Sequence, residues 1–136
     1  GMNELNVSAT LDNLERVMDF VAQHLERCGC PARTQMQVAL AVEEIYANIA
    51  NYAYNPAVGP ATIRVEVHED PLEVVITFVD NGKPYDPLAR EDPDVTLSAE
   101  ERGVGGLGIF LVKQTMDDVS YEYAGGRNIL KIRKRL

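Results

Sequence analysis

One predicted helix carries polar side chains in a pattern that could bind a metal ion and activate a hydroxyl group. Glu44, Asn48 and Asn51 are spaced at i, i+4 and i+7, which places them along one stripe of a helix. No Lys or Arg occurs from residue 37 to residue 54, so no cation on this helix pairs with them. An asparagine oxygen is a neutral ligand for Mg²⁺, and phosphate oxygens can fill its other positions. A carboxylate one turn away could orient or deprotonate a nucleophile.

The same stripe has a second interpretation, which is a solvated helix face that binds nothing. The adjacent Glu43 is expected to be solvated in this way. The apolar face of the helix should pack on a sheet, and its centre lies roughly 110° from the polar stripe at a helical spacing of about 100° per residue. The apolar residues of that face are Val38, Val42, Ile45, Ile49 and Tyr52.

An aspartate stands directly after a predicted apolar strand. Asp80 is followed by Asn81 and Gly82. A carboxylate at the end of a strand can accept a hydrogen bond from an exocyclic amine, such as that of adenine. Gly82 would let a ligand approach the backbone closely. An ordinary Asp-Asn-Gly turn would have the same sequence, so this motif alone leaves both interpretations open.

A run of glycines precedes a short apolar helix. Gly103, Gly105, Gly106 and Gly108 would expose successive backbone N–H groups at a helix N-terminus, which favours phosphate. No Gly-Lys-Ser/Thr follows, so the run is not a Walker A loop. It also does not join the first strand and helix of a βαβ unit, so it is not a Rossmann turn.

Hydrophobic periodicity predicts the elements that must position these residues. The pattern predicts a strand at residues 4–9, helices at 11–28 and 31–54, a hairpin at 63–68 and 72–79, a loop at 83–105, a helix at 109–116 and strands at 119–123 and 128–135. This order predicts an α+β fold. We expect a two-layer α/β sandwich in which a mixed, mostly antiparallel sheet has helices on one face.

Length and charge limit the class of protein. The 136 residues suit a single domain over residues 2–136. The 21 Asp and Glu residues against 13 Lys and Arg argue against a nucleic-acid binder, which needs cations to displace counterions. No apolar run approaches the ~18 residues of a membrane span, and no signal peptide is visible. Cys28 and Cys30 are expected to be reduced thiols, so we predict a cytoplasmic protein.

Together, the three motifs resemble the nucleotide-binding boxes of the GHKL ATPases. Within that superfamily the chain is most similar to the small anti-sigma factor/serine protein kinases of the RsbW and SpoIIAB type. The resemblance is carried by residues 41–48, 80–87 and 105–112, together with residues 116–121 and the Asn128-x-Leu130 ending. It spans nearly the whole chain.

The resemblance implies a histidine kinase-like ATPase fold with one site for ATP and Mg²⁺. It implies Asn48 as the metal ligand, Glu44 as the general base, and Asp80, with Gly82 beside it, as the adenine-reading carboxylate. Residues 87–104 are implied to form an ATP lid. The other candidate cofactor-binding residues are Asn51, Tyr85, Arg102, Gly103, Gly105, Gly106, Leu107 and Gly108. The family often has a His four residues after the Asn, where this chain has Tyr52.

The resemblance also implies a function. It implies a serine/threonine protein kinase that phosphorylates a STAS-type anti-anti-sigma protein, sequesters a sigma factor and forms a homodimer, with no nucleic-acid or membrane partner. One alternative is a non-catalytic ATP- or ADP-binding module that switches partner binding through its lid. A detached ATP-binding half of a histidine kinase is less favoured, because the chain lacks a dimerisation helix pair with a phospho-accepting His.

Overall fold

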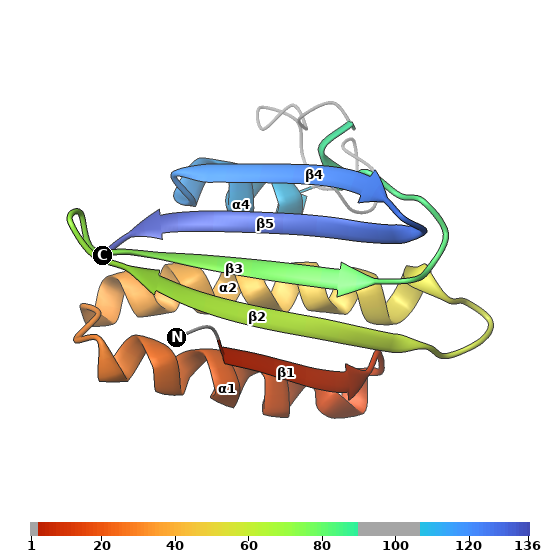
Figure 1. The fold of residues 1–136 in the computed structure, drawn as a ribbon, viewed down its shortest axis with the longest axis horizontal. Helices are drawn as coiled ribbons and strands as arrows, with labels where there is room; N and C mark the ends of the chain where they lie inside the picture. The colour runs from red at the N-terminus through yellow and green to blue at the C-terminus, as the bar shows by residue number, and fades with distance from the viewer. Residues whose placement is uncertain (1–2, 90–106) are drawn as a thin grey trace.

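The described part of the computed structural model, residues 3–89 and 107–136, forms a five-stranded sheet with helices on one side (Figure 1). The strands are β1 (Asn3–Ser8), β2 (Pro60–His68), β3 (Glu73–Asp80), β4 (Asp118–Ala124) and β5 (Arg127–Arg135). Their order in the sheet is β1-β2-β3-β5-β4, so β1 and β4 form the two edges. The predicted α+β sandwich is therefore confirmed for the part of the chain that is described.

The sheet differs from the expected mixed sheet in one respect. Every ladder between the described strands is antiparallel. Tight turns join β2 to β3 and β4 to β5, which makes these pairs antiparallel. Between β1 and β2 the chain forms two helices. A single crossover helix would bring the next strand back parallel to β1, whereas the second helix reverses the chain direction once more, so β2 runs antiparallel to β1.

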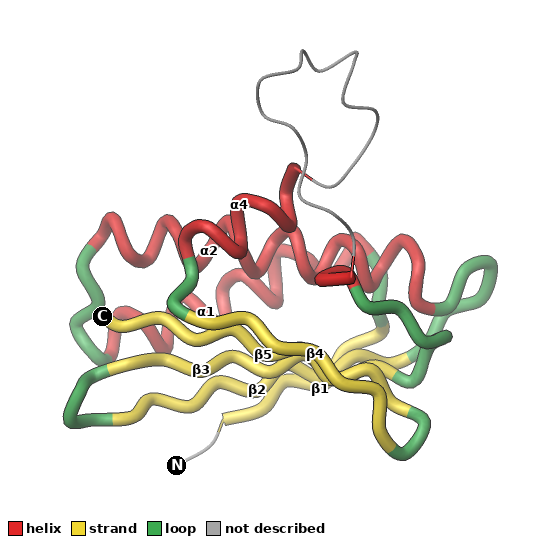
Figure 2. The backbone as a smooth tube through the Cα atoms, turned by 90° about the horizontal axis from the view of Figure 1, so that it is seen from above, coloured by secondary structure: helices red, strands yellow, loops and turns green. Residues whose placement is uncertain are grey.

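The helices lie together on one face of the sheet, as Figure 2 shows. They are α1 (Leu14–Arg27), α2 (Ala32–Asn48) and α4 (Leu107–Thr115). A 3₁₀ turn at Leu11–Asn13 precedes α1, and a π-helical turn at Ile49–Ala53 continues α2. Helix α2 contacts both α1 and α4, so it is the central helix of its layer. None of the described helices is long and apolar enough to cross a membrane.

The core lies between α2 and the central strands. Val38, Val42 and Ile45 are buried on α2, as the apolar stripe predicts. Tyr52 belongs to the predicted stripe but is 57% exposed. The π-helical turn explains this difference, because it has more residues per turn than an α-helix and rotates the following side chains out of phase.

Tyr46 fixes the position of α2 against the end of β1. Its side chain is fully buried, and its hydroxyl donates to the Thr10 carbonyl at 2.7 Å and contacts the Ser8 carbonyl at 3.1 Å. The same oxygen accepts the Thr10 N–H at 3.2 Å. Burial raises the pKa of this phenol, so it stays a neutral donor. The helix that carries Glu44 and Asn48 is thereby held in place across the core.

Candidate functional site

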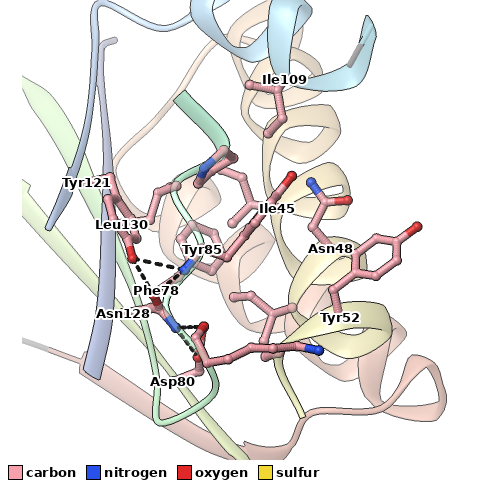
Figure 3. Close-up of a pocket in the computed structure, with 14 residues that line it drawn as sticks. Ile45, Asn48, Tyr52, Phe78, Asp80, Tyr85, Ile109, Tyr121, Asn128 and Leu130 are labelled. Atoms are coloured by element: carbon pink, nitrogen blue, oxygen red, sulfur yellow. Dashed lines mark hydrogen bonds between the residues drawn. The ribbon is translucent and has the colours of Figure 1, made fainter. Parts of the chain in front are cut away.

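A pocket opens between α2 and the end of β3 (Figure 3). Asn48 and Tyr52 line it from the helix side, and Asp80 and Asn128 line it from the sheet. Ile109, in the first turn of α4, closes it from a third direction. Apolar side chains form much of the remaining wall, and these are Ile45, Ile49, Phe78 and Leu130. The structure thus brings two of the predicted motifs into one pocket, with the beginning of α4 beside them.

Asp80 is the last residue of β3, and only 5% of it is exposed. Its Oδ1 accepts two hydrogen bonds, from the Gly82 N–H and from the Asn128 amide, each 2.9 Å long. Among the residues that the structure describes, none donates to Oδ2. A buried carboxylate with one free oxygen can accept a strong hydrogen bond from an N–H group of a ligand.

The loop after Asp80 is pinned to the π-helical turn. A Cβ atom at Gly82 would lie 2.3 Å from the Ala53 carbonyl oxygen, so only glycine permits this close approach. The Lys83 N–H donates to the same carbonyl at 3.1 Å. The approach that requires glycine is therefore to the chain's own backbone, and the predicted contact of Gly82 with a ligand stays a prediction.

Tyr54 holds the same loop from outside the pocket. Its hydroxyl accepts the Asn81 N–H at 2.7 Å and donates to the Pro60 carbonyl at 2.5 Å. Burial raises the pKa of Tyr54, and the charge of nearby Asp80 raises it further, whereas the bond from Asn81 lowers it. The residues that follow Asp80 are thus attached to neighbouring elements, which gives its carboxylate a fixed direction.

Asn128 on β5 is a site residue that had no assigned role in the sequence motifs. It lies directly opposite Asp80 in the β3–β5 ladder and is 6% exposed. Its Nδ2 donates to Asp80 and to the Lys83 carbonyl, each at 2.9 Å. Its Oδ1 accepts the Tyr85 N–H at 3.2 Å and the Tyr121 hydroxyl. The sequence did contain a sign of this residue. Asn128 alternates with Leu130 and Ile132 along the strand, so it is a polar residue at a position whose neighbours two and four residues on face the core.

Glu44 lies against the beginning of α4. A Cβ atom at Gly108 would lie 2.1 Å from Glu44 Cδ and 2.4 Å from each carboxylate oxygen. Glu44 does not line the pocket that holds Asn48 and Asp80. It lines an adjoining groove between α2 and α4, together with Gly108 and Leu111. A carboxylate is electrostatically favoured there, because the first turn of a helix carries unpaired N–H groups.

The other predicted site residues divide into four groups. Tyr85 lines the pocket and is 43% exposed. Asn51 is exposed on the π-helical turn and does not line the pocket, because the changed helical phase interrupts the predicted stripe. Four candidates lie outside the described residues, and these are Arg102, Gly103, Gly105 and Gly106. Leu107 begins α4, but its side chain is not among those described.

The predicted lid lies mostly outside the described residues as well. Only its first part, the 3₁₀ turn Pro87–Ala89, is described, and Pro87 lines the pocket. Within residues 3–89 and 107–136, no three or more His, Cys, Asp or Glu side chains could together hold a metal ion.

The candidate residues thus meet in a pocket between an antiparallel sheet and the helices on one of its faces. Residues 7–134 match the family model of the histidine kinase-like ATPase domain, so the chain belongs to that family. The membership inferred from the three motifs is thereby confirmed.

The chain is similar to several protein kinases. It is 31% identical over 101 residues to the serine/threonine-protein kinase BtrW of Bordetella bronchiseptica, covering 74% of this chain and 70% of that protein. It is 33% identical over 131 residues to the serine-protein kinase RsbW of Bacillus cereus, covering 93% of this chain and 81% of that protein. Another RsbW, from Listeria monocytogenes, is 32% identical over 109 residues, covering 76% and 68% of the two chains.

Two solved structures share the fold. A Mycobacterium tuberculosis protein with RsbU and RsbW domains superimposes with a TM-score of 0.66 and 14% identity, covering 98% of this chain and 32% of that one. A chain of the SiaB–SiaC complex of Pseudomonas aeruginosa superimposes with a TM-score of 0.57 and 19% identity, covering 98% and 89%. These structures support the predicted histidine kinase-like ATPase fold.

Proposed function

We propose that this chain is an ATP-dependent serine/threonine protein kinase of the anti-sigma type, which phosphorylates an anti-anti-sigma partner. Relatives at 31–33% identity over most of the chain are named serine or serine/threonine protein kinases, and this supports the activity. The observation that carries the proposal is the convergence of Asp80 and Asn48 on one pocket, with Glu44 at its border.

The residues present fit an adenine ring. Oδ2 of Asp80, to which no residue of the described part donates, is an acceptor for the exocyclic amine, and the partly buried Ile49 offers apolar surface to the face of a purine. Asn48 stands on the opposite wall, where its side-chain oxygen could bind Mg²⁺. Bound ATP with Mg²⁺ would supply a transferable phosphoryl group and neutralise part of the charge on the phosphate oxygens.

Glu44 fits the role of general base for a serine of another protein. Its carboxylate lies in a groove between α2 and α4 and is partly exposed, so a hydroxyl from outside can reach it. Glu44 would accept the hydroxyl proton while the serine oxygen forms its bond to phosphorus and the bond to the leaving ADP breaks. Most of the rate enhancement would come from positioning, as is general in phosphoryl transfer.

The proposal includes three further expectations about partners and location. The substrate is a STAS-type anti-anti-sigma protein, the sequestered partner is a sigma factor, and the chain acts as a cytoplasmic homodimer. The resemblance to the anti-sigma kinase group supports these expectations. The structural neighbour solved as a SiaB–SiaC complex is an example of the same fold in a protein–protein assembly.

A second candidate function is a nucleotide-binding regulatory module without phosphotransfer. One observation favours it, which is that Glu44 does not line the pocket with Asn48 and Asp80. Phosphotransfer from labelled ATP to purified STAS proteins, combined with calorimetric binding of ATP, separates the two functions. Transfer by the wild type and its loss in Glu44→Ala, with ATP binding retained, would support the kinase. Binding without transfer to any tested partner would support the module.

A further inference from the structure

We infer that Asn128 is the positioning residue that makes this pocket select a 6-amino purine, and that Tyr121 holds Asn128 in place. Asn128 does this through Asp80 and does not need to touch the nucleotide itself. The inference rests on the proposed function, because it concerns the base of the nucleotide that the pocket would bind.

The hydrogen bonds of Asn128 leave its amide one orientation. Its Nδ2 faces the Asp80 carboxylate and the Lys83 carbonyl, and neither group can donate. Its Oδ1 faces the Tyr85 N–H, which can only donate. Both amide hydrogens and both oxygen lone pairs are used, since the Tyr121 hydroxyl is also bonded to Oδ1. If the amide were flipped, its NH₂ group would face the Tyr85 N–H, and its oxygen would face the Asp80 carboxylate and the Lys83 carbonyl. At three of the four contacts a donor would then meet a donor or an acceptor would meet an acceptor.

This orientation determines what Asp80 can offer a ligand. The two N–H groups at its Oδ1, from Gly82 and Asn128, can only donate and therefore match an ionised carboxylate. The remaining oxygen, Oδ2, then accepts and cannot donate. A 6-amino purine presents an N–H to this oxygen, whereas a 6-oxo purine presents another acceptor and is repelled. The choice between the two bases thus depends on the donor that Asn128 supplies.

Tyr121 supports Asn128 from the next strand. It pairs with Leu130 in the β4–β5 ladder, so Asn128 is its diagonal neighbour on the inward face. Its hydroxyl also accepts the Tyr85 N–H at 3.3 Å. The side chain lines the pocket close to Asn128 and Tyr85, as Figure 3 shows. Three strands, β3, β5 and β4, therefore share one hydrogen-bonded group at the base end of the pocket.

Asn128→Asp is the sharpest test, because it keeps the shape of the side chain and removes the donor. Two carboxyl groups in direct contact cannot both be ionised, so the pair keeps a shared proton. When a 6-amino group faces Oδ2, this proton lies between the two carboxyl groups and Oδ2 accepts. When a 6-oxo group faces Oδ2, the same proton can instead sit on Oδ2 of Asp80 and donate, which the wild-type pair cannot do because it holds no such proton. The variant should therefore change the preference between bases as well as the affinity.

The experiment measures the binding of ATP and of inosine triphosphate, a 6-oxo purine nucleotide, to the full chain with Mg²⁺ by titration calorimetry. The wild type should bind ATP at least about 100-fold more tightly, because a site built for an N–H donor rejects an analogue without it. Asn128→Asp should reduce this ratio to about tenfold or less. Tyr121→Phe should reduce it by about threefold, as expected for one lost hydrogen bond. Asn6→Asp on β1 is the matched control and should leave the ratio unchanged.

The outcomes separate this inference from the proposed function. Equal weakening of both nucleotides by Asn128→Asp would show a merely structural role and overturn the inference, while the proposed function would stand. A wild type that binds ATP without preference over inosine triphosphate would also overturn the inference alone. A wild type that binds neither nucleotide would overturn both. If circular dichroism shows that Asn128→Asp is unfolded, an unchanged ratio in Tyr121→Phe overturns the inference.

Discussion

The carboxylate of Glu44 occupies the space that a side chain at position 108 would need, because a Cβ atom at Gly108 would lie 2.1 Å from Glu44 Cδ. Glycine inside a helix costs about 1 kcal/mol relative to alanine. In α4 this glycine makes room for a carboxylate on α2, so the candidate base and the candidate phosphate-binding segment are in direct contact. The glycine is needed for this contact whether or not a phosphate also binds there.

Gly108→Ala should therefore impair phosphotransfer more than nucleotide binding. The new methyl group displaces the flexible end of Glu44, and a misplacement of about 1 Å can cost about 100-fold in rate. We expect a decrease in the transfer rate of that order, with a dissociation constant for ATP within about fivefold of the wild type. Gln114→Ala, on the exposed side of α4, is the control. Unchanged transfer by Gly108→Ala would contradict the placement of Glu44 as the base.

Glu44→Gln tests the base directly. The amide keeps the size of the side chain but cannot accept the serine proton, so transfer should fall by about 100- to 10,000-fold. ATP affinity should change little, because Glu44 lies outside the pocket that Asp80 lines. The neighbouring Glu43 is exposed and provides a matched control, Glu43→Gln, that should keep full activity. Single-turnover transfer from labelled ATP measures both variants, and equal losses would refute the assignment.

Asp80→Asn should weaken ATP binding by about 10- to 100-fold, the value of a hydrogen bond to a charged group. Gly82 and Asn128 both donate toward Oδ1, so the new amide should turn its oxygen to them and its NH₂ group into the pocket. That group repels the amine of adenine. Calorimetric titration with ATP measures the loss, and Asp118→Asn, on an exposed residue of β4, is the control. Wild-type affinity in Asp80→Asn would refute the adenine contact.

Tyr46→Phe should lower the free energy of unfolding by about 1–2 kcal/mol, because the Thr10 carbonyl and N–H lose their shared partner. Burial raises the pKa of Tyr46 in the folded state above the unfolded value of about 10. The folded chain therefore holds the proton more tightly, and stability is complete below pH ~10 and is lost as the pH rises further. Urea unfolding at pH 7 to 11 should show this decline, reduced in Tyr46→Phe.

The exposed Tyr123 offers the control for that experiment. Tyr123→Phe should leave both the stability at pH 7 and the alkaline decline close to those of the wild type, because its phenol is not enclosed. An alkaline decline of the same size in Tyr46→Phe and the wild type would show that other groups, such as Tyr54, whose pKa burial also raises, dominate it.

Local periodicity was sufficient to predict the helices and strands and the residues that the helices bury. Val38 and Val42 recur at helical spacing and are buried on α2, because hydrophobic burial acts on one face of each element. Asp80 could be recognised as a candidate binding residue because it is an ionisable residue at the end of an otherwise apolar strand. The π-helical turn could not be predicted from the periodicity. Asn51 and Tyr52 therefore point in directions that differ from those expected in a continuous α-helix, and both are exposed.

The sequence by itself therefore determined the order of the elements, their apolar faces and the residue types available for nucleotide chemistry, because these depend on neighbours a few positions apart. Only the tertiary structure decided which of those residues meet. Asn128 faces Asp80 across 48 positions of chain through strand register, and Glu44 meets Gly108 through the packing of α2 against α4. Such contacts depend on the summed packing of all elements, which no local pattern contains.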